Sequence, residues 1–344
     1  MLNIHYDLPY DSTFSNYTGA SDRKVANLWD LVRGLVRMAK PCEINKGSAF
    51  TFVKDCLGGN KADYGKAQFP IDNGISEKII PIKVIGSGSQ GKVELCYCEG
   101  SFICRKTISL TLASYRARCM VYSYVLALED QYKNNVVGLT PTFGMYISKD
   151  LNSFHIITEY SGLPDIFDIF YSSSDIPTPS TKSALEILLV VCRCIENVHS
   201  AKFVHRDIKL ENILLNKNGE VSLCDSLTCI KCDNKTRFKP AHMVRGTHLP
   251  PEFSKIKSKD SIKYDPYATD VFSMGEDIET FCDDIFGVPE NPCHRYAGVD
   301  KNIARGLLAL SKVMKSKNPR KRPSMKTVAD RIEMLLWSTR SPYI

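Results

Sequence analysis

One short run of the chain holds the residue types from which chemistry can be built. Residues 205–212 read HRDIKLEN, and Asp225 follows thirteen positions after Asn212. The set offers a carboxylate in Asp207, an ammonium in Lys209, an amide in Asn212 and a second carboxylate in Asp225. Phosphoryl transfer needs a carboxylate to accept the proton of the attacking hydroxyl and oxygen ligands to hold Mg²⁺ against nucleotide phosphates. The run therefore predicts a phosphoryl-transfer site on a loop that leads into a hairpin.

A glycine-rich turn upstream could bind those phosphates. Residues 86–93 read GSGSQGKV and lie between two predicted strands, 79–85 and 92–98. Gly86, Gly88 and Gly91 at a hairpin tip would let backbone N–H groups approach phosphate oxygens without a Cβ in the way. A Rossmann dinucleotide site is disfavoured, because its glycines join a strand to a helix.

A lysine lies thirteen residues after Val93. Lys106 is at the end of the alternating run FICRK in a third predicted strand, 102–108, from which its ammonium could reach phosphates. The neighbouring Arg105 should point to the opposite face of the strand. A solvated lysine on an edge strand is the alternative interpretation.

The remaining pattern predicts the elements that position these groups. Helices are expected over 111–130 and 181–200 and in three stretches from about 268 onward, and strands over 154–160 and around the turn Asn218-Gly219. Residues 22–40 have apolar residues at helical spacing. We favour an appended helix that packs on the domain, with a partner-binding or membrane-surface helix as the alternative.

Composition limits the class of protein. The chain has 344 residues, 43% of them hydrophobic and 24% charged, with a formal charge of +7, which is typical of a globular protein. We expect no transmembrane segment, no secretory signal and no nucleic-acid partner. Thirteen cysteines, several within apolar runs, indicate reduced buried thiols and a reducing, cytoplasmic compartment. Cys229 and Cys232 form a CxxC pair, for which a metal or redox site is the alternative.

Taken together, the glycine-rich hairpin, the strand lysine, HRDIKLEN and Asp225 resemble the eukaryotic-type protein kinases, in the Ser/Thr branch. The resemblance covers about residues 79–338. It implies an α+β, bilobal fold with an N-terminal extension (1–78), a small antiparallel-sheet lobe (79–159), a larger, mainly helical lobe (160–338) and a tail (339–344). It also implies ATP and Mg²⁺ as cofactors and a protein substrate with a Ser or Thr acceptor.

The resemblance assigns a role to each matching residue. Asp207 would be the catalytic base, Lys209 would neutralise the transferred group, and Thr247 would bond near both. Asn212 and Asp225 would be the Mg²⁺ ligands. Nucleotide binding falls to a larger set: Ile85, Gly86, Gly88, Gly91, Val93, Cys104, Lys106, Glu159, Ser161, Asp165 and Leu214.

Two further matches concern support of the site. Arg322 resembles the arginine that pairs with Glu252 of the Pro-Pro-Glu motif, and Asp270 resembles an aspartate that braces the HRD backbone. The run KNPRKRP around Arg322 could instead be a nuclear address. If the chain diverges from the family pattern because it is a viral or bacterial effector kinase, we expect it to act in a host cell.

Three features depart from the family pattern. The metal-binding triplet reads Asp225-Ser226-Leu227, without the usual aromatic residue. No acidic residue lies between Thr107 and Leu128, so Glu129 is the first candidate to pair with Lys106. The segment GTHLPPE is two residues shorter than the family's spacing, which affects the platform for a peptide substrate.

These departures leave alternatives open. A pseudokinase that binds nucleotide or acts as a scaffold is the second hypothesis, and a small-molecule kinase is the third. Lys209 and the pairing of Glu252 with Arg322 speak against the third hypothesis. For activation, we expect Arg206, together with Arg116 or Arg118, to hold a phosphate on the following loop. The candidate acceptors of that phosphate are Thr228 and Thr236.

Overall fold

The computed structural model describes the chain in several stretches: residues 72, 74–88, 91–98, 100–109, 136–150, 152–171, 181–216, 218–232, 248–253, 264–285 and 301–338, with single positions between 124 and 134. These residues form two compact units. A sheet unit contains the described residues up to 131 and Thr140–Gly162, and a helical unit contains Asn134–Leu139 and the chain from Leu163. The predicted helix over 22–40 lies outside the described residues, as do most of 111–130, Glu129 and Thr247.

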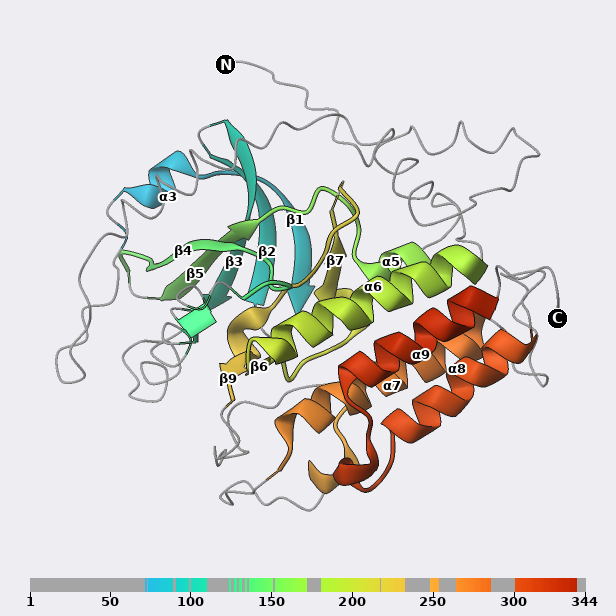
Figure 1. Cartoon of the computed structure of the whole chain (residues 1–344). Coiled ribbons are helices and arrows are strands. Elements are labelled where there is room, and N and C mark those ends of the chain that lie inside the picture. The colour runs from blue at the N-terminus through green and yellow to red at the C-terminus, as the bar shows by residue number, and fades with distance from the viewer. Residues whose placement is uncertain are drawn as a thin grey trace, which may run out of the picture. The chain divides into compact units, whose positions relative to one another are not determined.

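The sheet unit is built on five antiparallel strands in the order β1-β2-β3-β5-β4 (Figure 1). Its elements are α3 (Ile75–Lys78), β1 (Ile80–Gly88), β2 (Gly91–Cys98), β3 (Ser101–Ser109), β4 (Thr142–Ile147) and β5 (Ser153–Glu159). Side chains that alternate along β2 and β3 bury one face, where Cys96, Cys98 and Ile103 pack with Tyr146 and Ile157. The core of this unit is therefore made by cross-strand apolar pairs.

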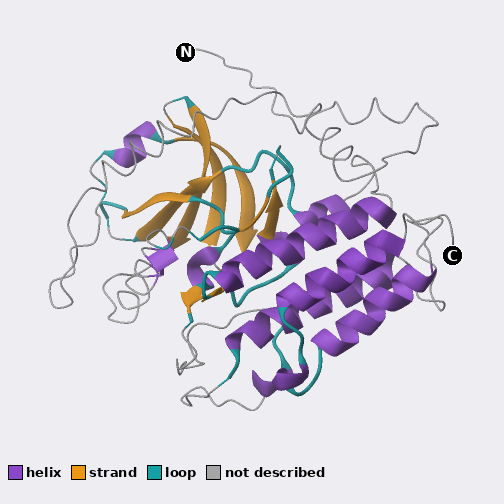
Figure 2. Ribbon diagram, in the orientation of Figure 1, coloured by secondary structure: helices purple, strands orange, loops and turns teal. Residues whose placement is uncertain are grey.

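The helical unit starts with α5 (Ile166–Tyr171) and α6 (Thr181–Ser200) and ends with three more helices: α7 (Pro266–Ile285), α8 (Lys301–Met314) and α9 (Met325–Ser338). Helix α6 packs on α9, and α8 packs on both α7 and α9, so that the purple helices of Figure 2 form a bundle. A Cβ on Gly275 would lie only 2.8 Å from the Cβ of Met314. The crossing of α7 and α8 is that close because residue 275 has no side chain.

Short elements between α6 and α7 carry the residues of the predicted site. In chain order they are β6 (Phe203–Val204), η2 (Leu210–Asn212), β7 (Ile213–Leu215), β8 (Val221–Leu223), η3 (Ser226–Thr228), β9 (Ile230–Lys231) and η5 (Pro251–Phe253). A further short element, η6 (Pro319–Lys321), follows α8. Strand β7 pairs with β8, and β6 pairs with β9. These two small ladders bring the HRDIKLEN loop and the segment around Asp225 into one layer.

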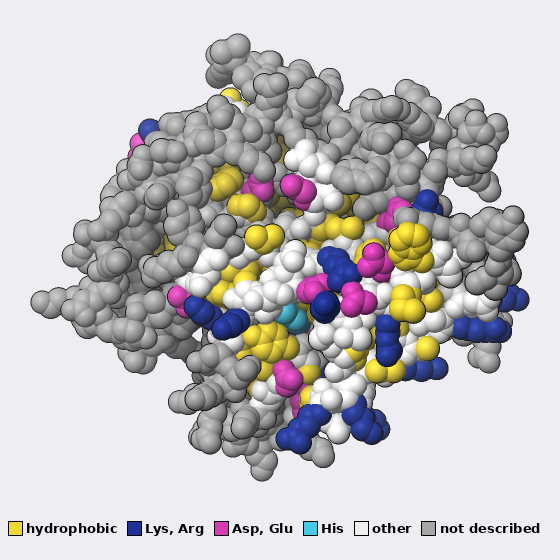
Figure 3. Space-filling model, in the orientation of Figure 1, with side chains coloured by type: hydrophobic (Ala, Val, Ile, Leu, Met, Phe, Trp, Pro, Cys, Tyr) yellow, Lys and Arg dark blue, Asp and Glu magenta, His cyan; other side chains and the backbone are white. Residues whose placement is uncertain are grey.

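The surface of the helical unit carries mixed charge. Arg193 on α6 forms ion pairs with Glu196, Asp330 and Glu333, which ties α6 to α9. In Figure 3, basic and acidic side chains are interspersed with apolar ones on the face in view. Among the described helices, none has both the length and the apolar character needed to cross a membrane.

Candidate active site

A buried aspartate on α7 holds the turn of the HRDIKLEN loop. Asp270 is fully buried, and its two carboxylate oxygens accept hydrogen bonds from the backbone N–H groups of His205 (2.8 Å) and Arg206 (2.7 Å). His199 on α6 contacts the same carboxylate at 2.9 Å through Nε2. Arg206 has a left-handed backbone with φ of 67°, which a residue with a Cβ adopts only at a cost. The predicted bracing by Asp270 is confirmed, and it stabilises this strained turn.

The loop is joined to the segment that carries Asp225. The Nε2 of His205 lies 2.9 Å from the carbonyl oxygen of Cys224, and the N–H of Cys224 donates to the carbonyl oxygen of Asn212 at 2.9 Å. Asp225, next along the chain, is itself left-handed, with φ of 58°. Hydrogen bonds to both the N–H and the carbonyl oxygen of Cys224 therefore fix the backbone position from which Asp225 follows.

Asp207 and Asn212 are in direct contact. The side-chain N–H of Asn212 donates to the carbonyl oxygen of Asp207 (2.8 Å) and to its carboxylate oxygen Oδ2 (3.0 Å). Asp207 is only 4% exposed. Burial raises the pKa of Asp207, while the positive charge of Lys209 opposes that shift and the nearby Asp225 adds to it. A buried carboxylate with a raised pKa accepts a proton more readily than an exposed aspartate does.

The same contacts suit a hard cation. Because the nitrogen of the Asn212 amide is used on Asp207, its oxygen is the atom left to ligate a metal. Together with the Asp225 carboxylate this gives oxygen ligands, which Mg²⁺ prefers. The residues present therefore fit the cofactor that the sequence predicts.

In the sheet unit, the lysine and glycine positions fall on neighbouring strands. Lys106 on β3 pairs with Val93 on β2 and Ile156 on β5. Its neighbour Arg105 forms an ion pair with Glu94 at 2.9 Å, so the second cation of the strand is already engaged. Cys104 pairs with Leu95, two positions along the same strand.

The three glycines at the tip of the β1–β2 hairpin differ in what the fold requires. Gly91 has φ of 121°, and a Cβ there would lie 2.2 Å from the carbonyl oxygen of Thr107. A Cβ on Gly86 would meet only the Val93 side chain, at 3.7 Å, and one on Gly88 would meet nothing within 4 Å. The fold thus requires glycine at position 91 and leaves open space at positions 86 and 88.

The other predicted nucleotide-binding residues take several positions. Ile85 is exposed on β1, Glu159 ends β5 and Ser161 follows it, all within the sheet unit. In the helical unit, Asp165 and Leu214 form an isolated antiparallel bridge. The Asp165 carboxylate also accepts from the N–H of Asp168 (2.8 Å) at the start of α5, and burial raises the pKa of Asp165 to about 6.

The structure changes the expectation for activation. Thr228 is not a free acceptor, because its hydroxyl donates to the carbonyl oxygen of His205 at 2.8 Å. Arg206 is 3% exposed, and its guanidinium donates to the Thr228 carbonyl oxygen, so this arginine is buried under η3 rather than presented to a phosphate. Arg116, Arg118 and Thr236 lie outside the described residues.

The cysteine pair and the altered triplet are both part of the core. Cys229 and Cys232 are buried, and burial raises the pKa of Cys229. The described residues include no group of His, Cys, Asp and Glu side chains arranged around a metal. Ser226 and Leu227 are likewise buried.

The predicted pairing of Glu252 with Arg322 is confirmed. The guanidinium donates to both carboxylate oxygens of Glu252 at 2.7 Å and to the Ala268 carbonyl oxygen at 3.0 Å.

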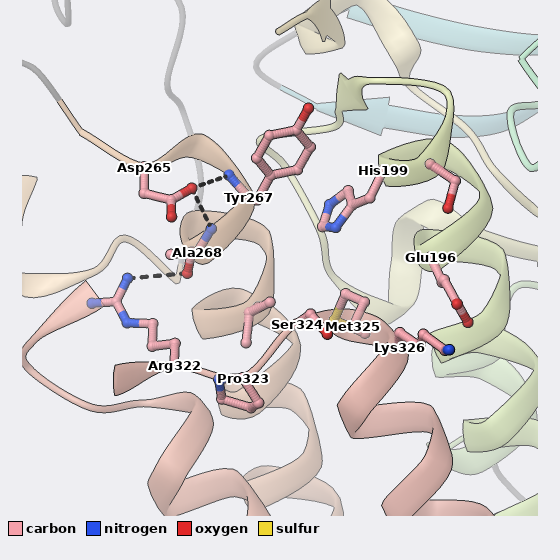
Figure 4. A pocket seen from close by; sticks show the side chains of 12 residues that line it. Glu196, His199, Asp265, Tyr267, Ala268, Arg322, Pro323, Ser324, Met325 and Lys326 are labelled. Carbon is pink, nitrogen blue, oxygen red and sulfur yellow. Dashed lines mark hydrogen bonds between the residues drawn. The ribbon is translucent and has the colours of Figure 1, made fainter. Parts of the chain in front are cut away.

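Figure 4 shows Arg322 at one wall of a pocket of about 390 Å³, with His199 and Asp265 on other walls. None of the predicted site residues lines this pocket. Two of its ionisable side chains are engaged within the unit, since Asp265 caps α7 and His199 contacts Asp270.

Sequence reasoning missed the supporting histidines. It predicted no role for His199 or for the ring of His205, because a single histidine in a helix or loop carries no signal of its partner. The HRD spacing marked the position of His205, but its bond to Cys224 depends on how the loop folds back.

Comparison with known proteins agrees with this geometry. The family model described as "Protein kinase domain" matches residues 80–331. The chain is 27% identical over 154 residues to MAP kinase kinase MKK1/SSP32 of Saccharomyces cerevisiae, covering 44% of this chain and 30% of that protein. It is 29% identical over 208 residues to serine/threonine-protein kinase SBK1 of Danio rerio, covering 58% and 49%. It is 23% identical over 275 residues to serine/threonine-protein kinase Nek1 of Mus musculus, and that match covers 74% of this chain and 21% of Nek1.

The matches therefore span less than half the length of each of these relatives. The family match covers well over half of this chain, and the antiparallel sheet of five strands and the helical unit are those of the α+β fold that the sequence predicts. The chain belongs to the protein kinase domain family.

Proposed function

We propose that the chain is a Ser/Thr protein kinase that transfers the γ-phosphoryl group of ATP, with Mg²⁺, to hydroxyl groups of protein substrates. The observation that carries the proposal is the hydrogen bond between Asn212 and Asp207, together with the contact of His205 that fixes the backbone just before Asp225. These three residues supply a proton acceptor and oxygen ligands within one braced loop.

Each residue has a distinct task in this reaction. Asp207 orients the acceptor hydroxyl and takes its proton, aided by the raised pKa that burial causes. Lys209 balances the negative charge of the transferred group, and Lys106 with the β1–β2 turn holds the phosphates. Bound Mg²⁺ supplies charge neutralisation at the phosphate oxygens, and Asn212 and Asp225 would hold it. Asp270 acts through the backbone by keeping the loop in its strained conformation.

Lys209 at this position and the similarity to serine/threonine-protein kinases support Ser and Thr as acceptors. Phosphoamino-acid analysis of the labelled product tests this point directly. Phosphotyrosine as the main product would contradict it.

Incorporation of labelled phosphate tests the reaction itself. Asp207→Asn and Lys106→Met should each lower incorporation into a protein substrate by about 100-fold or more, since each removes a group that acts in the transition state. Lys149→Met, an exposed lysine in the turn between β4 and β5, is the matched control and should leave the rate unchanged. Equal incorporation of phosphate by the wild type and both site variants would contradict the proposed kinase activity.

The second candidate is a pseudokinase, and the buried Ser226-Leu227 pair in the metal-binding triplet is the observation that favours it. Stabilisation by ATP and Mg²⁺ in a thermal-shift assay, without any phosphoryl transfer, would support this candidate.

A further inference from the structure

His248, in the shortened segment before Pro-Pro-Glu, is attached to α7 at two points. The hydroxyl of Ser273 donates to the His248 carbonyl oxygen at 3.0 Å. The ring Nε2 of His248 lies 3.4 Å from the carboxylate oxygen Oδ1 of Asp277. Ser273 and Asp277 are four residues apart and so lie on one face of the helix. A single helical turn therefore holds both the backbone and the ring of His248.

Asp277 is an unusual residue to find at this depth. It is 6% exposed, and its second carboxylate oxygen accepts no hydrogen bond from any residue that the structure describes. Burial raises the pKa of Asp277 well above its usual range, and the charges of Glu211 and Glu276 act in the same direction. A buried carboxylate with one oxygen left without a hydrogen-bond partner costs folding free energy, and an apolar side chain would not incur that cost. Stability alone therefore does not account for this aspartate.

The position of Asp277 relates it to the catalytic loop. Its charge interacts with those of Lys209 and Glu211, on either side of Leu210 in that loop. The segment that His248 begins is held at its other end by the ion pair of Glu252 with Arg322. Between these two anchors Leu249 is 42% exposed. The segment is thus a strap, fixed at both ends near the catalytic loop, with a side chain presented to solvent.

We propose that His248 and Asp277 are positioning residues for the protein substrate: together they hold residues 248–253 on α7 beside the catalytic loop. The inference rests on the proposed function and extends it to the recognition of the acceptor protein. Binding of the protein substrate depends on this anchor, whereas binding of ATP does not.

Steady-state kinetics with myelin basic protein as the probe substrate test the anchor. His248→Gln and Asp277→Asn should each raise the KM for this protein by about fivefold to tenfold, with the KM for ATP unchanged. The double variant should be no worse than either single variant, because both remove the same contact. Asp283→Asn, an exposed aspartate on the same helix, is the matched control. An unchanged KM for the protein in either single variant overturns the inference.

Stability separates positioning from a structural role. The folded-state pKa of Asp277 is raised, so its ionised form disfavours folding at pH values above the ordinary aspartate range. Asp277→Asn should therefore unfold at the same or a higher temperature than wild type at pH 8, although it binds the substrate more weakly. A lower melting temperature together with a higher KM for both substrates would mean that Asp277 is merely structural.

Hydrogen exchange provides a readout that does not need turnover. Peptides covering residues 248–253 should exchange faster in His248→Gln and in Asp277→Asn than in Asp283→Asn. Unchanged exchange overturns the anchor even if the kinase is active. If wild type transfers no phosphoryl group, the proposed function fails together with the substrate role of the anchor. The exchange result then decides only whether the anchor exists.

Discussion

The glycines of the β1–β2 hairpin allow a test that separates folding from nucleotide binding. At Gly91, φ is 121° and a Cβ would lie 2.2 Å from the Thr107 carbonyl oxygen, well inside ordinary contact. Alanine there incurs about 1–2 kcal/mol for the positive φ, and displacing the β3 backbone adds strain of about 1–3 kcal/mol. We expect Gly91→Ala to destabilise the sheet unit by about 2–5 kcal/mol.

Positions 86 and 88 should behave in the opposite way. Their φ values are not in the left-handed region and an added Cβ has room, so Gly86→Ala and Gly88→Ala should change stability by less than about 1 kcal/mol, in the stabilising direction. If nucleotide phosphates approach this backbone, the same two variants should raise the KM for ATP several-fold. Calorimetry measures the first effect and ATP titration the second. A loss of stability at position 88 equal to that at position 91 would refute the reasoning.

Three further predictions concern the helical unit. Arg322→Met should lower the free energy of unfolding by about 3–5 kcal/mol in urea titrations, because it leaves Glu252 without its partner; an equal loss in the exposed control Lys321→Met would contradict this reason. Asp270→Asn should lower the rate of phosphoryl transfer by about 100-fold with little change in the KM for ATP, because one of its two acceptor oxygens becomes a donor group. An unchanged rate would show that the HRDIKLEN loop keeps its conformation without the Asp270 carboxylate. Asp165→Asn should raise the melting temperature at pH 7.5 but not at pH 3.5. The folded-state pKa of about 6 lies above the ordinary 3.8, so the ionised carboxylate disfavours folding as pH rises through this window; a gain of equal size at both pH values would rule out this cause.

The fold was most predictable where one pattern persisted over a long stretch. Helix α6 covers Thr181–Ser200, the range that its apolar periodicity predicts, because five turns give that pattern room to repeat. Strand β4 (Thr142–Ile147) was not predicted. It is short, contains Gly144, lies at the edge of the sheet and has a register shift between Thr142 and Gly144, so its alternation is broken.

Within the site, the sequence predicted groups that carry a motif and missed groups defined only by proximity. Asp270 and Arg322 could be found because their surrounding residues mark them. Asp277 and His199 could not, since each acts through a partner more than 25 positions away and neither partner is signalled by spacing. The acidic neighbours Glu276 and Glu279 give no signal of a core position, yet the structure buries Asp277.

The altered triplet after Asp225 bears on function less than its sequence suggests. Asp225 is located by bonds to the main chain of Cys224, one from the ring of His205 and one to the carbonyl oxygen of Asn212. Neither bond uses the side chain at position 226 or 227. The left-handed backbone of Asp225 and that of Arg206 are both local strains, and the anchors that hold them are Asp270 and His205, which are intact. A serine in place of an aromatic residue therefore changes the packing beneath η3, while the constraints that place the Asp225 carboxylate remain.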